Sequence, residues 1–174
     1  MKLALLWFAS WKNSMSSYAP EWVKVDYRRF PRSRDRDDTA IEILSPFSKE
    51  NATADAKAFA ALMRHIRKID TDHTVIMVQP ENEIGMVDHA RDYSATATEA
   101  YHSEVPEELI DYLTEHRNSL TPELLDAWSR SEFATSGSWK IVFGDSPQAE
   151  EIFMAWHFAA YTERVTKAGK AEHP

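Results

Sequence analysis

The chain has 174 residues, no cysteine and a formal net charge of −8 at pH 7. This length fits one globular domain with its own core, and the lack of cysteine excludes disulfides, thiol catalysis and cysteine-ligated metals. The negative charge disfavours nucleic acid and anionic membrane surfaces as partners, and no apolar run approaches the roughly 20 residues of a membrane span.

The first element we predict is a β-strand over Lys2–Phe8. A continuous apolar run rich in aromatic residues is typical of a parallel strand that is covered on both faces. The same run resembles a short signal peptide with Lys2 as its basic residue, but no convincing small-residue cleavage site follows it. We therefore prefer the strand, and the cellular location stays open.

A polar, turn-rich region follows this strand. Residues 28–38 alternate in charge and contain Pro31, which favours a solvated loop or a short hairpin. Thr39–Phe47 predicts a short extended piece that ends near its proline.

A long helix and a second apolar strand come next. The helix is predicted over 51–69 with Asn51 as its cap, because apolar side chains recur there at helical spacing while Asp55 lies off their stripe. The stripe consists of Phe59, Leu62, Met63, Ile66 and Ile69. The strand is predicted over Thr74–Val78, which completes the strand–helix–strand pattern of a parallel βαβ unit.

The rest of the chain is predicted to be mainly helical. Met86–Val105 has the composition of a polar surface excursion, and Ser136–Asp145 predicts a turn with a short strand. Proline near the first turn is a helix start signal, and glycine is a stop signal. These signals predict helices over Val105–His116, Thr121–Arg130 and Ser146–Gly169. Trp128, Trp139 and Trp156 are interpreted as core or interface residues.

Together these elements predict a single α/β domain. Residues 1–85 would form two parallel strands with their connecting helix, and residues 86–174 would be mainly helical. A complete (β/α)₈ barrel takes about 250 residues, so the chain would hold roughly two of its eight units. Two strands alone would leave open edges, which invite self-association.

The stretch "VIMVQPENEIG" places Glu81, Asn82 and Glu83 directly after the second strand. In parallel α/β folds, active sites form at the carboxyl ends of the strands. Glycoside hydrolysis needs one carboxylic acid that protonates the leaving oxygen and a second carboxylate opposite it, and an amide can bind sugar hydroxyls. The alternative is that both acids merely solvate a strand end.

An inverting pair formed by the two acids themselves is a further alternative. If the strand stayed extended, Glu81 and Glu83 would point the same way, about 6.6 Å apart along the backbone. Both acids would then lie on one side of the sugar, so we disfavour this arrangement.

Two blocks resemble glycoside hydrolase family thirty-five, the β-galactosidases, which are retaining (β/α)₈-barrel enzymes. "QPENEIG" resembles the family's "QVENEYG" signature at the end of strand four. "LLWFASWKNSMSSYAPEWV" resembles its third strand, and is most similar to the bacterial branch in which that strand reads "WFGSWKNG". The resemblance implies a partial TIM (β/α)₈ barrel that covers about strands three and four with their helices, plus a helical insertion, so the chain is expected to be a fragment.

The resemblance also assigns roles to the residues after the second strand. Glu83 matches the general acid/base, and Asn82 matches the residue that binds the 2-hydroxyl of the sugar. Glu81 matches either an acid near the far side of the sugar or a residue that braces the strand end. Pro80 replaces the usual valine and has no N–H to donate to the sheet, which could change the direction in which the Glu83 side chain points.

Residues after the first strand are assigned to the same pocket by resemblance. Ser10 occupies the place of a sugar-binding glutamate in many members, and Trp11 and Asn13 would line the pocket. Tryptophan suits this role because its flat face covers the apolar side of a pyranose.

The function implied by the resemblance is retaining hydrolysis of terminal β-galactosides, with a β-galactoside or oligosaccharide as substrate and without a metal or organic cofactor. The family nucleophile lies on strand seven, and no glutamate here replaces it, so the isolated chain is expected to be inactive. The alternatives are a non-catalytic or vestigial carbohydrate-binding chain, and an interaction domain that uses the acidic helices over 106–131. Full-length relatives are often periplasmic or secreted.

Overall fold

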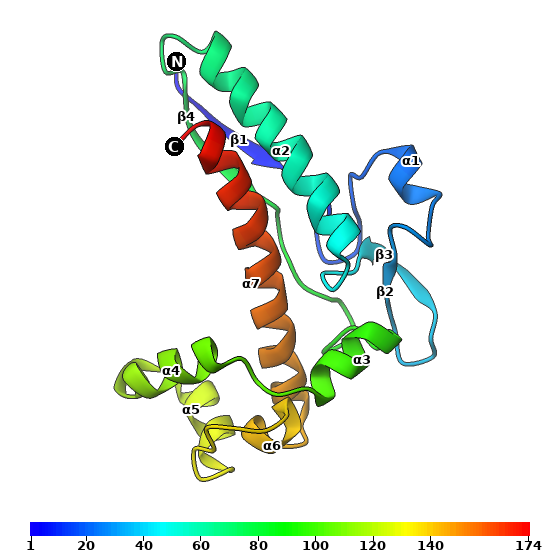
Figure 1. Ribbon diagram of the computed structural model, residues 1–174, viewed down its shortest axis with the longest axis vertical. Helices are drawn as coiled ribbons and strands as arrows, with labels where there is room; N and C mark the ends of the chain where they lie inside the picture. The colour runs from blue at the N-terminus through cyan, green and yellow to red at the C-terminus, as the bar shows by residue number, and fades with distance from the viewer.

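Two parallel strands lie against two long helices in the computed structural model, which describes residues 1–174 (Figure 1). The strands are β1 (Leu3–Trp7) and β4 (Val75–Pro80), and the helices are α2 (Lys49–Ile69) and α7 (Pro147–Glu172). Both helices run side by side and opposite in direction to the strands (Figure 1). The chain is therefore a mixed α/β protein, as expected, but its two strands do not close a barrel.

The remaining elements are short. They are α1 (Glu21–Lys24), β2 (Arg32–Arg34), β3 (Ala40–Leu44), α3 (Ala95–His102), α4 (Glu107–Glu115), the 3₁₀ helix η1 (Arg117–Ser119), α5 (Pro122–Ser129) and α6 (Trp139–Phe143). The antiparallel pairing of β2 with β3 makes the charged region a hairpin, one of the two forms expected for it. No helix combines the length and the apolar composition of a membrane span.

The parallel pair is covered on one face only. Trp7 and Val78 pack against the main core, whereas Leu6 and Met77 on the opposite face are 52% and 54% exposed. The expectation that the first strand is covered on both faces is therefore wrong. Helices α2 and α7 supply the layer on one face, and Leu6 and Met77 remain exposed on the other.

Helix α2 begins at a different cap from the expected one. Ser48 is the N-cap, and its hydroxyl accepts a hydrogen bond from the Asn51 backbone N–H. The side chain of Asn51 is buried, and its Nδ2 donates to the carbonyl oxygens of Pro31 and Ser45, both at 3.0 Å. Asn51 thus joins the start of α2 to the hairpin.

Helix α7 continues through the glycine that was expected to end it. Gly169 is buried at the crossing with α2, and a Cβ at this position would lie 2.2 Å from Phe59 Cε1. The backbone therefore needs glycine for close packing of the two helices rather than for a helix stop.

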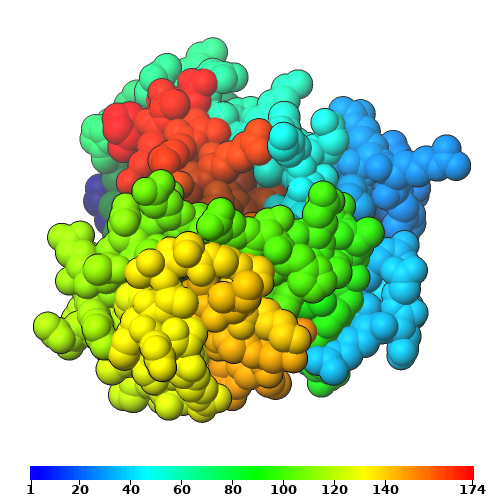
Figure 2. Space-filling view, turned by 60° about the horizontal axis from the view of Figure 1, so that its bottom comes forward, coloured from blue at the N-terminus to red at the C-terminus, as the bar shows by residue number.

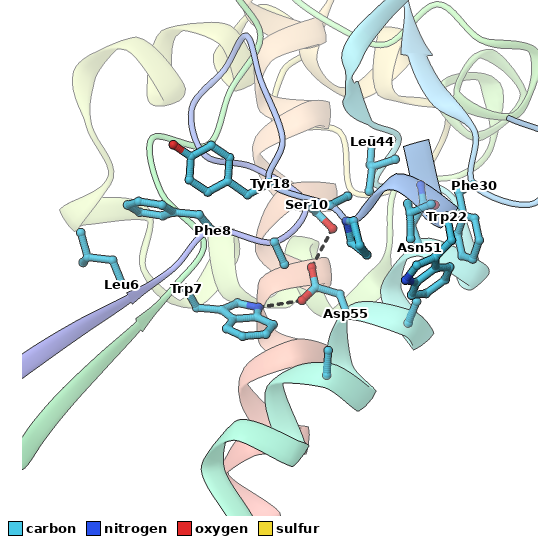
Figure 3. A pocket seen from close by; sticks show the side chains of 16 residues that line it. Leu6, Trp7, Phe8, Ser10, Tyr18, Trp22, Phe30, Leu44, Asn51 and Asp55 are labelled. Carbon is cyan, nitrogen blue, oxygen red and sulfur yellow. Dashed lines mark hydrogen bonds between the residues drawn. The ribbon is translucent and has the colours of Figure 1, made fainter. Parts of the chain in front are cut away.

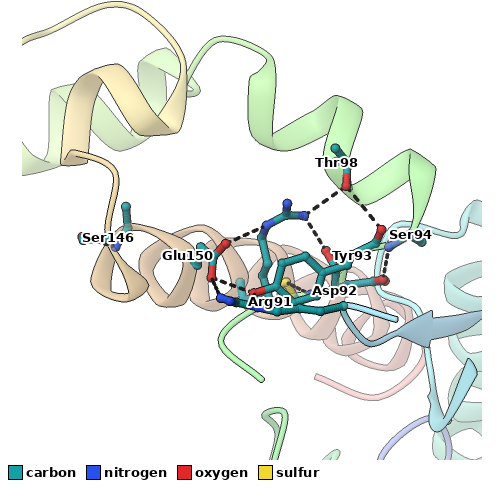
Figure 4. Close-up of polar contacts among 10 residues, drawn as sticks. Arg91, Asp92, Tyr93, Ser94, Thr98, Ser146 and Glu150 are labelled. Carbon is teal, nitrogen blue, oxygen red and sulfur yellow. Dashed lines mark hydrogen bonds and ion pairs between the residues drawn. The ribbon is translucent and has the colours of Figure 1, made fainter. Parts of the chain in front are cut away.

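Met86–Val105 was expected to be a polar excursion on the surface, but the part of it before α3 is partly buried. Arg91 and Asp92 are buried, and Arg91 Nε donates to Glu150 Oε1 at the start of α7 at 3.2 Å (Figure 4). The Asp92 carboxylate accepts from Arg34 N at 3.0 Å and from Ser45 Oγ at 2.8 Å. This network joins the hairpin to α7.

Helices α3 to α6 gather around the first turns of α7 (Figures 1 and 2). The predicted helices near 105–116, 121–130 and 146–169 are confirmed, with small changes of their ends. The short strand predicted within Ser136–Asp145 is wrong, because these residues contain α6. Trp139, Val142 and Phe143 are spaced by three and one, so a helical turn buries all three on one face.

Candidate functional site

The loops that follow the two parallel strands are bonded to each other. Asn82 N donates to the carbonyl oxygen of Trp11 at 3.2 Å, and Asn82 Nδ2 donates to the carbonyl oxygen of Lys12 at 2.9 Å. The structure thus brings together the two sequence blocks, 10–13 and 81–83, from which the site was predicted.

Strand β4 does not continue through the acidic motif. It ends at Pro80, and Glu81 and Glu83 both have left-handed backbone conformations, with φ of 59° and 44°. Such values are uncommon for residues other than glycine and persist where surrounding contacts hold them. An extended Glu81–Glu83 pair is therefore absent, and the inverting arrangement has no basis in this fold.

Glu81 is buried at the strand exits, and its contacts match the bracing role, one of the two considered for it. The side chain is 1% exposed, and Oε2 accepts a hydrogen bond of 2.8 Å from Trp11 N. Burial, and secondly the neighbouring Asp55 carboxyl, raise the pKa of Glu81 to about 10. A pKa in this range favours the protonated carboxyl at neutral pH, and the buried side chain offers no exposed surface to a ligand.

Asp55 of α2 is the centre of the polar contacts around Glu81, although the sequence analysis placed it off the apolar stripe. Its Oδ1 accepts from Trp7 Nε1 at 2.8 Å, and its Oδ2 accepts from Ser10 Oγ at 2.6 Å (Figure 3). Tyr161 OH of α7 lies 2.6 Å from Ser10 Oγ. The missed signal was the spacing of four residues between Asp55 and Phe59, which puts both on the buried face of α2.

Two residues expected to contact sugar, Trp11 and Ser10, are buried in the interior. Trp11 has no exposed surface, and its ring packs edge-on against Phe158 and Tyr161. Its expected role as a sugar platform is therefore wrong in this structure, because no solvent reaches either ring face. Ser10 is buried as well, and its hydroxyl is used by Asp55 and Tyr161 rather than left for a ligand.

The two asparagines shape the loops that they belong to. Asn13 Oδ1 accepts from Met15 N at 3.0 Å and from Ser16 Oγ at 2.9 Å, which fixes a tight turn. Asn82 Oδ1 accepts from Gln79 Nε2 at 3.1 Å while its amide nitrogen holds Lys12. Both side chains are only partly buried, so they lie at the surface of the joined loops.

Glu83 is the one predicted site residue whose functional group the fold does not use. Its side chain is exposed and forms neither a hydrogen bond nor an ion pair within the chain. Its backbone follows directly from Asn82, which is bonded to the other loop. The arrangement presents a free carboxylate beside an amide at the exit of a parallel strand.

A cavity of about 430 Å³ lies between β1, α1 and α2, and residues 8–10 of the first loop form part of its wall (Figure 3). Its walls are mainly apolar and aromatic, and include Phe8, Tyr18 and Trp22. Asp55 is at its edge, but Glu83 does not line it. The cavity and the predicted acid/base are therefore separate features.

The chain brings no metal-binding cluster together: no three histidine, aspartate or glutamate side chains are grouped closely enough to hold an ion. Comparison with protein-family models and with curated proteins found no match to this chain.

Proposed function

We propose that the chain is the part of a retaining β-galactosidase-like glycosidase that carries the general acid/base residue. The observation that carries this proposal is Glu83, an exposed carboxylate without internal partners at the exit of a parallel strand. Asn82 next to it is anchored to the neighbouring strand exit, so the pair has a defined place relative to the sheet. The carboxyl ends of parallel strands are the usual location of active sites in α/β folds.

In the proposed reaction, Glu83 protonates the departing glycosidic oxygen while a second carboxylate attacks the anomeric carbon. The ionised Glu83 then takes a proton from water, which releases the sugar from its covalent ester. The amide of Asn82 bonds Lys12 O and Gln79 Nε2, and in the proposed reaction its second N–H would bind a sugar hydroxyl. The family resemblance places the nucleophile on strand seven, so in this proposal it comes from a strand outside these residues.

The proposed architecture is a (β/α)₈ barrel of which β1 and β4 are two strands. The open sheet face supports this proposal, because the lumen of such a barrel is filled by side chains from its strands. Leu6 and Met77 would contribute to that filling, and the unpaired edges of β1 and β4 would bond further strands. The parallel packing of α2 and α7 on the outer face agrees with the outer helical ring of such barrels.

The test is hydrolysis of aryl β-galactosides by a polypeptide that carries the remaining strands, compared with its Glu83→Ala and Glu83→Gln variants. For poor leaving groups we expect kcat to fall by about 10²–10⁴-fold, the contribution of general acid catalysis. For dinitrophenyl galactoside, which leaves without protonation, the first step should be spared, and azide should restore turnover of Glu83→Ala. Equal losses for all leaving groups would contradict the acid/base role.

The 174-residue chain alone is expected to show no turnover of the same substrates. Activity of this chain that Glu83→Gln removes would disprove the proposed external nucleophile. Saturable binding of a β-galactoside by the intact polypeptide without any turnover would instead support a carbohydrate-binding function.

A further inference from the structure

Two carboxyl groups from distant parts of the sequence are buried where the strand exits meet α2, and they bond the adjacent residues Ser10 and Trp11. Asp55 is 5% and Glu81 is 1% exposed, and neither forms an ion pair. Removing two adjacent negative charges from water without a cation is strongly unfavourable. The pair therefore cannot be explained as two ionised side chains.

The hydrogen bonds indicate where a proton resides. Both oxygens of Asp55 accept hydrogen bonds, from Trp7 and from Ser10. In Glu81, Oε2 accepts from Trp11 N, but Oε1 is buried without any partner. A proton on Glu81 would satisfy that side chain by giving it a hydrogen bond to donate to Asp55.

We propose that Glu81 is a protonated donor to Asp55, and that this carboxyl pair is the positioning device that holds the two strand exits together. Glu81 holds the first loop through Trp11 N, and Asp55 holds it through Trp7 and Ser10. Asn82 and Glu83 follow immediately in the chain, so the pair sets where they stand relative to β1. This inference does not depend on the glycosidase proposal.

The groups that face the pair contain no positive charge. Helix α7 contributes Tyr161, whose pKa is raised above its usual value by burial and then by Asp55. Strand β1 contributes the neutral side chain of Trp7, the first loop contributes the hydroxyl of Ser10 and the backbone N–H of Trp11, and α2 contributes Asp55 itself. The same surroundings raise the pKa of Glu81 to about 10, in agreement with the hydrogen-bond pattern.

The proton on Glu81 makes the stability of the folded chain depend on pH in a direction that can be worked out. In the unfolded chain Glu81 ionises near pH 4.5, whereas in the folded chain it keeps its proton up to about pH 10. The folded state thus binds one more proton between these values, and stability must fall as the pH rises through them. The unfolding equilibrium constant should increase by up to about tenfold per pH unit from this residue alone.

The first experiment measures urea unfolding of the 174-residue chain between about pH 5 and pH 9, the window set by the two pKa values. Glu81→Gln keeps an acceptor for Trp11 N and a donor for Asp55 but cannot ionise. Relative to wild type, we expect its unfolding constant to be at least about a hundredfold lower at pH 9, with much less change at pH 5. Glu83→Gln makes the same chemical change on the exposed neighbour and should retain the wild-type slope.

A second measurement uses the wild-type protein and needs no tolerated substitution. The carboxyl ¹³C resonance of Glu81 should remain at its protonated shift through neutral pH.

A third measurement compares variants. Amide exchange at Trp11 and Asn82 should stay slow in Glu81→Gln and become fast in Glu81→Leu, which removes the acceptor. A Glu81 resonance that titrates near pH 4.5, or parallel stability profiles for wild type and Glu81→Gln, would overturn the proposal.

Discussion

Glu83 and Glu81 are separated by one residue, yet the fold uses them in opposite ways. Glu81 turns inward to Trp11 N, whereas Glu83 remains exposed and free of internal bonds. Both acids have left-handed backbone conformations and lie in a bend after β4. This bend, rather than strand alternation, separates a buried acid from an exposed acid within three residues.

The motif residues could be located from the sequence, but their roles could not all be assigned from it. The pattern of an apolar strand followed by Glu81–Asn82–Glu83 correctly predicts a strand exit. It does not contain the contacts that bury Trp11, because those contacts come from Phe158 and Tyr161, about 150 residues away. Asp55 was missed for a similar reason: it was placed off the apolar stripe, and its burial is explained only by partners from other segments.

The substitution Asp55→Asn tests how strongly the buried contacts depend on this carboxylate. The amide nitrogen would face a donor at either Trp7 Nε1 or Ser10 Oγ, which leaves one buried hydrogen bond unmade. We expect the free energy of unfolding to fall by about 1–3 kcal/mol at pH 7, measured by urea denaturation. The exposed substitution Asp72→Asn serves as the control and should change stability by less than about 0.5 kcal/mol. If Asp55→Asn and Asp72→Asn lowered the free energy of unfolding equally, the buried hydrogen bonds to Asp55 would not contribute to stability as expected.

At the scale of elements, periodicity and helix-end signals predicted the long helices well, and the short elements were predicted poorly. Helix α2 was identified from the stripe Phe59–Ile69, in which apolar side chains recur at helical spacing over about three turns. Helix α6 has only five residues, and its sequence "WKIVF" carries the β-branched and aromatic composition of a strand. Packing of Trp139 and Phe143 into the core decides its conformation, and that packing is not visible in so short a window.

Gly169→Ala tests the close crossing of α2 and α7. Alanine favours helix, but its methyl group would lie 2.2 Å and 2.6 Å from ring atoms of Phe59 and 3.0 Å from Met63 Cγ. Overpacking of this kind costs about 1–3 kcal/mol, and we expect a net loss of stability in thermal or urea unfolding. Lys170→Ala is the matched control, because Lys170 is exposed on the next position of the same helix.

The cost of Gly169→Ala should shrink when Phe59 is replaced by leucine, since the ring atoms in conflict are then removed. A coupling free energy of about 0.5 kcal/mol or more is expected from the double-mutant cycle. If Gly169→Ala stabilised the protein, close helix packing would not be the reason for this glycine.

At the scale of the whole molecule, the sequence predicted the parallel pair and its helices but not which strand face is open. An apolar run such as Leu3–Trp7 indicates that a strand prefers burial, but it does not identify the covering layer. Here α2 and α7 cover one face, and the second face keeps Leu6 and Met77 exposed. The exposed face and the two unpaired edges therefore lead us to expect self-association of the whole molecule through the sheet.

Self-association through this sheet can be measured by light scattering over a concentration series. We expect the apparent mass of the wild-type chain to rise with concentration, because burial of Leu6 and Met77 in a contact removes apolar surface from water. The double variant Leu6→Lys/Met77→Lys should shift the population toward monomer, since lysine charges on an open sheet face oppose pairing. Ile141→Lys is the control, because Ile141 is equally apolar and 61% exposed but lies on α6, outside the sheet. A monomeric wild type at all concentrations, or equal effects of the sheet and α6 substitutions, would show that the open face does not drive association.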